Sequence, residues 1–295
     1  MTSSSDSFNR KPEWLKIKLS GGKEYGDVKQ IVKENKLHTI CQSGNCPNIG
    51  ECWGAGTATF MILGDICTRS CGFCATKTGK PLPADETEPL RIALSVKKMR
   101  LKHAVITSVD RDDMSDGGAA IWASTIQKVR EFNPLTTIEV LLPDFRGQKA
   151  DLNLVLCQKP DIAAHNLETV KRLTPTVRSA ANYDRSLEII RTISQSGIIT
   201  KSGIMVGLGE TFEEILLTMD DLIDVGCQIF TIGQYLQPTR SHLPVKEYIH
   251  PDVFARLKQE GLSRGFKVVE SNPLVRSSYR AQKIIHNNID RDAPK

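Results

Sequence analysis

The sequence predicts an α/β fold in which six βα units form a partial parallel barrel, with an extension at each end. Apolar runs of strand length alternate with amphipathic helical runs from Thr57 onward, which is the pattern of parallel strands joined by crossover helices. The GxGxxG phosphate turn of a doubly wound sheet is missing after the first strand, where a cysteine motif stands instead. We therefore expect a partial (β/α)6 barrel of the TIM type over residues 57–271, with extensions at 1–56 and 272–295.

The composition is that of an ordinary globular protein. The chain has 295 residues, of which 40% are hydrophobic and 25% charged, enough for one barrel-sized core. Its net charge of +5 comes from scattered Lys and Arg, so we expect no nucleic-acid partner. The N-terminus lacks an apolar signal core and no apolar run has the length of a membrane span. We expect a cytoplasmic protein with no membrane partner.

Six strands are expected in the barrel. Each is a short run rich in β-branched or other apolar residues, bounded by turn residues or by a helical pattern. They are TATFMILG from Thr57, HAVITSV from His103, TIEVLLP from Thr137, DIAAHN from Asp161, TKSGIMVG from Thr200 and QIFTIGQYL from Gln228.

Helical patterns fill the intervals between these strands. They are DETEPLRIALSVKKMRL, GGAAIWASTIQKVREF, RSLEIIRTISQSG and TFEEILLTMDDLIDVG, several with an acidic first turn. Gly197 and Gly226 fit the position just after a helix, where a left-handed backbone is common. A further helix through PDVFARLKQEGLSRG and a strand FKVVES follow. In the N-terminal extension only YGDVKQIVKENKL has a sustained helical pattern.

The loop after the first strand carries a metal-ligand motif. GDICTRSCGFC places Cys67, Cys71 and Cys74 in the spacing CxxxCxxC, at the barrel end where chemistry gathers. Three thiolates hold three irons of a [4Fe–4S] cube and leave the fourth iron open for a ligand. This spacing, after the first strand of a βα series, resembles the radical S-adenosylmethionine (SAM) superfamily. The resemblance implies that the open iron binds SAM and that its reductive cleavage gives a 5′-deoxyadenosyl radical.

The remaining strand ends offer contacts for SAM. TSVDRDDMSDGG follows the second strand, HNLET the fourth and GIMVGLGET the fifth, so their polar residues should meet at one barrel mouth. Backbone groups near Gly117 and Gly118 are further candidates. The candidate side chains for SAM contact are Thr107, Asp110, Asn166 and Glu210.

A second cysteine set lies upstream, where TICQSGNCPNIGECW places Cys41, Cys46 and Cys52 in the spacing CxxxxCxxxxxC. Disulfides are disfavoured, because a chain of this size needs none and shows no secretion signal. From the ligand types alone, three interpretations remain open. They are a second metal centre, a structural zinc site and a cluster of free thiols. We expect the other two cysteines, Cys157 and Cys227, to be core residues.

Both cysteine sets together resemble those of lipoyl synthases. The likeness includes CPNIGECWGAGTATFMILGDICTRSCGFC, TSVDRDDMSDGGA, VLLPDFRG, MVGLGET, GQYLQPTRSHLPV and PLVRSSYRA, and it runs from about Lys11 to Ala281. It implies a radical SAM kind of partial barrel and two [4Fe–4S] clusters. It also implies insertion of two sulfur atoms, taken from the second cluster, at C6 and C8 of a protein-bound octanoyl group.

In that family the fourth ligand of the second, auxiliary cluster is a serine of the RSSY motif, here Arg276-Ser277-Ser278-Tyr279. We favour Ser278 over Ser277, although adjacent serines cannot be separated by sequence. Arg276 and Arg280 are positioned to pair with the cluster's negative charge or with carboxylates. The resemblance thus implies Cys41, Cys46, Cys52 and Ser278 as one ligand set and Cys67, Cys71 and Cys74 as the other.

The resemblance also implies partners. These are an octanoylated carrier, either the glycine cleavage H protein or a lipoyl domain of a 2-oxoacid dehydrogenase, an electron donor such as flavodoxin or ferredoxin, and an iron–sulfur cluster carrier. The rival enzymes are biotin synthase-like and tRNA methylthiotransferase-like proteins, which differ in the auxiliary motif. A non-catalytic two-cluster electron carrier would want four cysteines on each cluster, whereas each set here has three.

Overall fold

The computed structural model describes residues 11–17 and 21–278. One sheet runs through it, and its spatial strand order is the order along the chain. Every neighbouring pair is parallel except the first, in which β1 is antiparallel to β2. The strands are β1 (His38–Thr39), β2 (Thr59–Ile62), β5 (His103–Ser108), β6 (Thr137–Leu141), β7 (Ile162–Ala164), β8 (Ile199–Val206), β9 (Ile229–Gln234) and β10 (Val268–Ser271).

This order confirms the six expected barrel strands, β2 and β5 to β9, and the strand expected after them. That last strand, β10, extends the sheet beside β9. The two-residue β1 was not expected, since it is too short to show a period. In the described residues the sheet order begins at β1 and ends at β10, so the barrel is a partial one.

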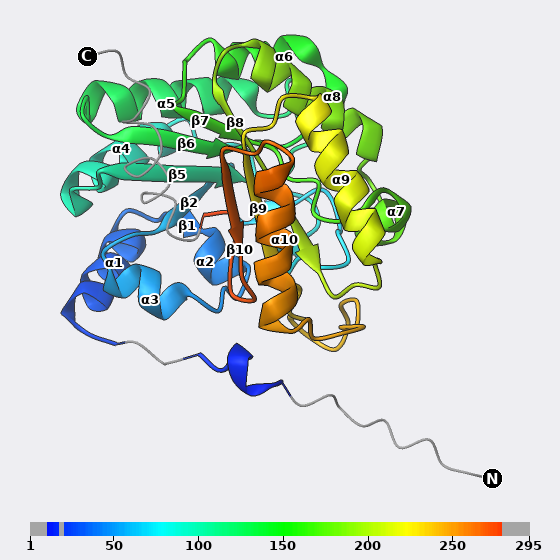
Figure 1. Cartoon of the computed structure of the whole chain (residues 1–295). Helices are drawn as coiled ribbons and strands as arrows, with labels where there is room; N and C mark the ends of the chain where they lie inside the picture. Colours follow the sequence, from blue (N-terminus) through cyan, green and yellow to red (C-terminus); the bar gives the residue numbers. More distant parts are fainter. Residues whose placement is uncertain (1–10, 18–20, 279–295) are drawn as a thin grey trace, which may run out of the picture.

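Helices cover the outer face of this sheet, as Figure 1 shows. The expected crossover helices are confirmed, and shorter helices occur between them in the chain. They are α4 (Glu88–Met99), α5 (Ala119–Phe132), α6 (Lys149–Leu156), α7 (Thr174–Val177), α8 (Tyr183–Gln195), α9 (Phe212–Asp224) and α10 (Pro251–Ser263). Gly197 and Gly226 follow α8 and α9 with φ of 78° and 81°, as helix-stop glycines should. The side chains of Thr211 and Glu214 form a capping box that starts α9.

The N-terminal extension contributes three helices beside β1 and β2 (Figure 1). The expected one is α1 (Lys23–Glu34), and two short ones follow, α2 (Ile40–Ser43) and α3 (Ile49–Gly54). Val28 and Val32 of α1 and Trp53 of α3 are buried in the same hydrophobic cluster as the first barrel strands. The extension is therefore packed onto the barrel by apolar contact and by the β1–β2 pairing.

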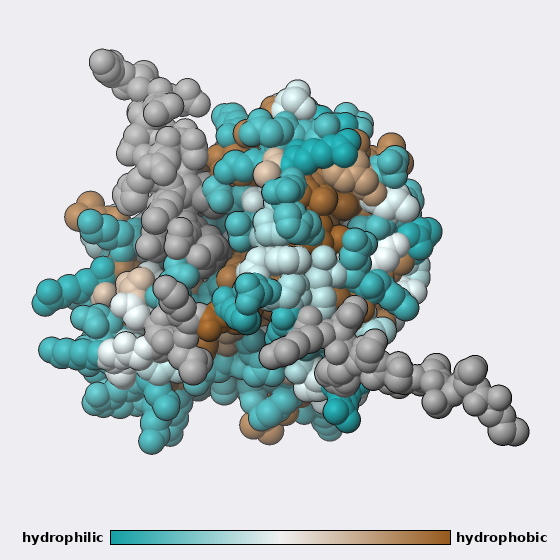
Figure 2. All heavy atoms as spheres, turned by 60° about the horizontal axis from the view of Figure 1, so that its bottom comes forward, coloured by the Kyte–Doolittle hydropathy of each residue, from teal (hydrophilic) through white to brown (hydrophobic). Residues whose placement is uncertain are grey.

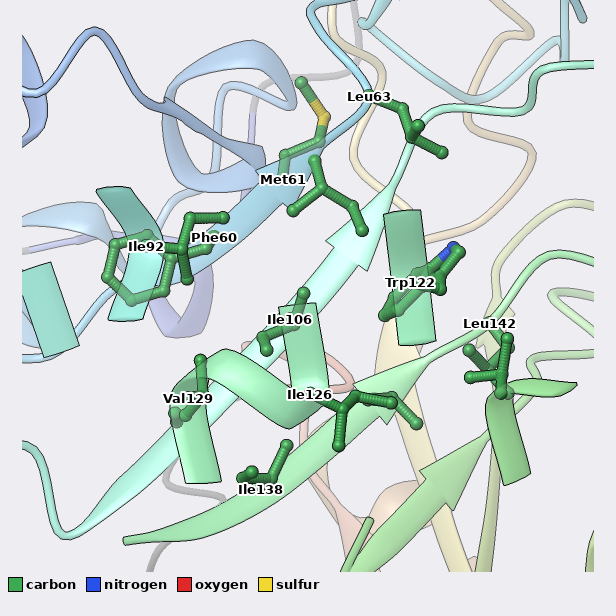
Figure 3. Packing of buried hydrophobic residues seen from close by; sticks show 14 of the residues in the cluster. Phe60, Met61, Leu63, Ile92, Ile106, Trp122, Ile126, Val129, Ile138 and Leu142 are labelled. Carbon is green, nitrogen blue, oxygen red and sulfur yellow. The ribbon is translucent and has the colours of Figure 1, made fainter. Parts of the chain in front are cut away.

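The main core lies between the sheet and the helices α4 and α5. Figure 3 shows Phe60 of the sheet near Ile92 of α4, and Ile106 of the sheet near Ile126 of α5. All four residues are fully buried. Replacing such a residue by alanine typically costs about 2–5 kcal/mol. Polar side chains cover most of the face drawn in Figure 2, and hydrophobic ones show mainly between them. In residues 11–17 and 21–278 no helix is both long and apolar enough to span a membrane.

The opposite, inward face of the strands carries charge. Because side chains alternate along a strand, His103 on β5 and Glu139 on β6 point away from the packed helices. Lys201 of β8 is fully buried, and its Nζ lies 2.6 Å from Glu139 Oε1. His103 Nε2 lies 3.3 Å from the other carboxylate oxygen. Burial alone would raise the pKa of Glu139, but Lys201 and His103 outweigh it and lower that pKa to about 2.

One expectation about the core is wrong. Cys227 is buried as expected, but Cys157 is exposed. α6 ends at Leu156, and its buried face is formed by Leu152, Val155 and Leu156. Cys157 follows as the cap residue and falls on the solvent side of the helix.

Candidate active site

The downstream cysteine loop is fixed to the carboxyl end of the strands. β3 (Ile66–Cys67) pairs with β4 (Lys77–Thr78), which closes the loop into a small ribbon. Gly72 N–H donates to Val177 O at 3.0 Å, and Leu243 N–H donates to Gly72 O at 3.0 Å. A Cβ at Gly72 would lie 2.9 Å from the Leu243 side chain, so this close approach requires glycine. The loop is therefore held from both sides by barrel segments.

The thiols of this loop lie in a partly buried environment. Burial raises the pKa of Cys67 to about 11, helped by the nearby Asp110 carboxylate, and raises that of Cys71 to about 12. Cys67 Sγ accepts hydrogen bonds from the backbone N–H of Arg69 at 3.4 Å and of Asp110 at 3.3 Å. Such N–H···S bonds favour a thiolate, but a cation is needed to make deprotonation favourable here. Iron bound by these thiolates would supply that charge.

Arg69, within the CTRSC motif, joins this loop to two strand ends. Its guanidinium lies 3.3 Å from Asp110, 2.6 Å from Asp112 and 2.7 Å from Asp144. Asp110 and Asp112 follow β5 and Asp144 follows β6. The Arg69 side chain is only 6% exposed and that of Asp144 is fully buried, so the contact with Asp144 is desolvated. Arg69 thus ties the cysteine loop to the loops that follow two neighbouring strands.

The upstream cysteines lie on two short helices and the turn between them. Cys41 is in α2, Cys52 in α3, and Cys46 N–H donates to Cys41 O at 3.0 Å. The turn needs Gly44, because a Cβ there would lie 2.8 Å from Ile40 O. Burial raises the pKa of both Cys41 and Cys46. Like Cys67 and Cys71, these two thiols need a cation to ionise.

All three upstream cysteines line one cavity of about 60 Å³. Its wall also contains Thr59 and His103 from the amino-terminal parts of β2 and β5, and Arg276 and Ser278 from the tail. In the described residues no three Cys, His or carboxylate side chains converge as ligands of a single metal ion. A cubane needs no such convergence, because each thiolate binds a different iron. Three thiols and a hydroxyl around one cavity fit a [4Fe–4S] cluster better than a zinc ion.

The tail segment from Asn272 to Ser278 is held between the barrel and the extension. Gln234 N–H donates to Pro273 O at 3.1 Å, and the Asn48 side-chain amide donates to Leu274 O at 2.7 Å. A Cβ at Gly233 would lie 2.1 Å from Val275 O, so the tail can pass β9 this closely only beside glycine. The tail thereby reaches the upstream cysteines.

The two adjacent serines have different surroundings. Ser278 lines the cavity of the upstream cysteines. Ser277 Oγ instead accepts a hydrogen bond from Asn166 Nδ2 at 2.6 Å. Sequence logic could not separate these serines, and the structure places only Ser278 on the cysteine cavity. Tyr279 and Arg280 of the same motif lie outside the described residues.

The four side chains expected to contact SAM do not converge equally. Asp110 lies beside Cys67, with 3.8 Å between Oδ2 and Sγ. Thr107 is on the inward face of β5, and its hydroxyl donates to Leu141 O at 3.2 Å. Asn166 points to the tail, and Glu210 accepts hydrogen bonds from Gly207 N–H and Leu208 N–H of its own turn. Asp110 is thus the candidate that lies beside the downstream cysteines.

The glycine pair in the loop after β5 is engaged within that loop. Gly117 N–H donates to Met114 O at 3.2 Å, and Gly118 N–H donates to Asp116 Oδ1 at 2.9 Å. A Cβ at Gly118 would lie 2.4 Å from Leu63. These glycines therefore serve the turn and its packing before α5.

Sequence reasoning named Asp110 but missed Arg69 and its other two carboxylate partners, Asp112 and Asp144. An arginine between two metal-ligating cysteines was a readable signal, because a charged residue there needs a buried partner. Which carboxylates it meets depends on the neighbouring strands and was not readable.

A sequence profile described as the radical SAM superfamily matches residues 61–222. Solved structures share the fold. Methylornithine synthase (PylB) aligns with a TM-score of 0.54 and 15% identity, covering 93% of this chain and 89% of that one. HydG, a maturase of the [FeFe]-hydrogenase, aligns with a TM-score of 0.55 and 12% identity, covering 84% and 68%. The partial barrel with its three-cysteine loop therefore defines a radical SAM enzyme.

Known relatives show which kind of radical SAM enzyme the chain resembles. The chain is 62% identical over 279 residues to the lipoyl synthase of Bacteroides fragilis (strain YCH46), covering 95% of this chain and 97% of that protein. It is 60% identical to that of Bacteroides thetaiotaomicron, covering 94% and 98%, and 56% identical to that of Flavobacterium johnsoniae, covering 93% and 96%. The chain belongs to the lipoyl synthase family, which uses two [4Fe–4S] clusters and SAM. This likeness decides against the biotin synthase-like, methylthiotransferase-like and electron-carrier alternatives.

Proposed function

We propose that this lipoyl synthase inserts its two sulfur atoms at C6 and C8 of a carrier-bound octanoyl group by dividing the work between its two cysteine sets. Cys67, Cys71 and Cys74 hold the SAM-binding cluster. Cys41, Cys46 and Cys52, with Ser278, hold the auxiliary cluster. When bound, the first cluster supplies an electron to SAM and the second supplies sulfur. The observation that carries the assignment is that Ser278 and the three upstream cysteines line one cavity.

The chain's own residues position and shield these groups. Backbone N–H groups of Arg69 and Asp110 donate to the Cys67 sulfur and stabilise its charge. The Asp110 carboxylate, next to this sulfur, is placed to accept hydrogen bonds from the amino group of SAM, and Thr107 lies just before it, near the end of β5. Asn166 also donates to the tail and Glu210 also accepts from a backbone turn, and both remain proposed contacts of SAM. His103 and Arg276 complete the wall of the auxiliary cavity.

The family implies octanoylated lipoyl-domain substrates. We further propose a flavodoxin or ferredoxin as electron donor and an iron–sulfur carrier protein that rebuilds the auxiliary cluster. The H protein and the lipoyl domains of 2-oxoacid dehydrogenases are both proposed as carriers. A cytoplasmic location suits eight cysteines that form no disulfide in the part of the chain described by the structure.

The test is a pair of serine variants assayed under anaerobic conditions on an octanoylated carrier peptide. Ser278→Ala should retain reductive SAM cleavage but lose lipoyl product, because the hydroxyl lining the cysteine cavity is removed. Ser277→Ala is the matched control. It keeps the proposed ligand and should lose less product. A normal lipoyl yield from Ser278→Ala would refute the ligand assignment.

A further inference from the structure

Three ionisable side chains form a buried chain on the inward face of the sheet. They are His103 on β5, Glu139 on β6 and Lys201 on β8, which are 6%, 1% and 0% exposed. Lys201 Nζ lies 2.6 Å from one carboxylate oxygen of Glu139, and His103 Nε2 lies 3.3 Å from the other. Burying charged side chains this deeply is costly unless each one has a partner of opposite charge.

The hydrogen bonds of His103 place a hydrogen on both of its ring nitrogens. Lys201 keeps Glu139 ionised, and a carboxylate only accepts hydrogen bonds, so Nε2 is a donor. Nδ1 lies 2.9 Å from Thr137 Oγ1, and the Thr137 hydroxyl donates its single hydrogen to Lys102 O at 3.1 Å. Thr137 Oγ1 therefore accepts from Nδ1. A histidine that donates from both ring nitrogens carries a positive charge.

This charge has no counter-charge within the chain of three side chains. Lys201 and the doubly protonated His103 ring are two cations, and Glu139 is one anion, so one positive charge is in excess. A buried excess charge is stabilised when an anion lies beside it. His103 lines the cavity of the upstream cysteines, and a [4Fe–4S] cluster bound there by thiolates would carry a net negative charge. The cavity therefore supplies the missing counter-charge.

We propose that His103 is a cation in the wall of the auxiliary-cluster cavity, held there by Glu139 and Lys201, and that its charge stabilises the reduced, more negative state of that cluster. Glu139 and Lys201 are then positioning residues, because they act on the cavity through the His103 ring. The inference rests on the proposed function in taking this cavity as the site of the auxiliary cluster. It adds a side chain that tunes the electron affinity of the cluster without binding iron.

The experiment measures the midpoint potential of the auxiliary cluster in the full-length, anaerobically reconstituted protein, by a redox titration monitored by electron paramagnetic resonance. Cys67→Ala is the parent protein, because it should retain only the auxiliary cluster. His103→Gln keeps a hydrogen-bonding side chain and removes the charge. It should lower the ratio of reduced to oxidised cluster about tenfold, which is about 59 mV for one electron. One unit charge acting over about 12 Å at an effective dielectric constant of about 20 has an effect of this size.

Two further variants separate the charge of the ring from its shape. His103→Lys keeps a cation beside Glu139 and should hold the potential near that of the parent protein. His250→Gln is the matched control, because this histidine side chain is 56% exposed and pairs with Asp252 at 3.2 Å. It should leave the potential unchanged.

Two outcomes overturn the charge assignment. One is an equal potential for His103→Gln and His103→Lys, which would mean that the charge at this position has no effect. The other is a His103→Gln protein with the potential of the parent. That result is expected if the Thr137 hydroxyl turns toward Nδ1 and the His103 ring is neutral.

A double variant tests the role of the buried pair. Glu139→Gln with Lys201→Gln removes one negative and one positive charge, so its direct effect on the cluster is small, and the two amides can hydrogen-bond to each other. The His103 ring loses its anionic acceptor and with it the second hydrogen, so the potential should fall as far as in His103→Gln. A potential like that of the parent would overturn the positioning role of the pair. If the double variant does not fold, His103→Gln and His103→Lys still test the charge of the ring.

Failure of the proposed function looks different from failure of this inference. If the upstream cysteines held no cluster, the Cys67→Ala protein would contain no iron, and both the proposed function and the inference would be overturned. An unchanged potential in His103→Gln protein with about four irons per chain would overturn the inference alone.

Discussion

Arg69 is the residue through which the cysteine loop depends most directly on the rest of the barrel. The change to test is Arg69→Gln, which keeps a polar side chain of similar length and removes the charge. It leaves the carboxylates of Asp110, Asp112 and Asp144 without their shared cation. Asp144 keeps one cationic partner, Arg185, whose Nε lies 2.8 Å away, and the backbone N–H of Arg146 at 3.0 Å.

The size of the effect follows from the exposure of the three partners. The side chains of Asp110 and Asp112 are 25% and 34% exposed, so water replaces part of their lost contact. Asp144 is fully buried, and breaking a buried pair by removing one partner costs about 3–5 kcal/mol. For a chain of this size that corresponds to a melting temperature lower by about 6–20 °C. Most of the loss should come from Asp144.

The assay is thermal and urea unfolding of the anaerobic protein, with Arg185→Gln as the control. Arg185 is 31% exposed and contacts only this one carboxylate of the network, so its loss should cost about 1 kcal/mol. Equal effects of the two changes, or an Arg69→Gln protein within about 1 kcal/mol of the wild type, would refute the reasoning.

The same network gives a pH dependence. Burial alone would raise the pKa of Asp144, but Arg69 outweighs it and holds that pKa below its ordinary value. Stability from this carboxylate is therefore complete above the ordinary aspartate pKa of about 4 and is lost as pH falls through the lower folded-state value. The difference between wild type and Arg69→Gln should shrink below about pH 4. A difference that stays constant to pH 3 would contradict this account.

Three further outcomes are expected. Cys67→Ala should abolish SAM cleavage yet keep about four irons per chain, and retained cleavage would refute its assignment. Cys46→Ala should cleave SAM without forming lipoyl product, and a normal product yield would refute the sulfur-donor role of its set. Burial lowers the pKa of His165 to about 4, so stability should fall as pH drops from about 6.5 toward 4. Urea unfolding should show a flatter pH dependence for His165→Gln, and an unchanged dependence would exclude His165 as its source.

The strands and long helices could be predicted because their signals are local. Parallel strands covered by helices read as apolar runs, and α4, α5, α8, α9 and α10 show amphipathic patterns over twelve or more residues. The short α2 and α3, which carry two of the upstream cysteines, are too short for a period to appear. The error at Cys157 has a related cause, because the apolar run LNLVLC ends one residue beyond the buried face of α6.

The parts of the site that sequence could not supply are contacts between distant segments. Arg69 meets a carboxylate 75 residues away, and Asn166 meets Ser277 across 111 residues. Cysteine spacing predicts metal ligands because each set is compact in the chain. No periodicity encodes which serine faces which cavity. That distinction required the path of the tail past Gly233 and Asn166.

The fold explains how the proposed serine ligand can reach cysteines that lie near the other end of the chain. Asn48 and Leu274 are in contact across 226 residues, and closing a free loop of that length costs about 5 kcal/mol in the logarithmic term alone. The folded sheet removes most of this cost, because β1 anchors the cysteines and β10 ends at Ser271. Ser278 is then only seven positions beyond Ser271, and the same term falls to about 2 kcal/mol. The contacts of Asn48, Gln234 and Asn166 are enough to offset that remainder. The proposed fourth ligand is a hydroxyl, which binds iron less strongly than a thiolate, and the fold rather than the metal brings it to the cysteine cavity.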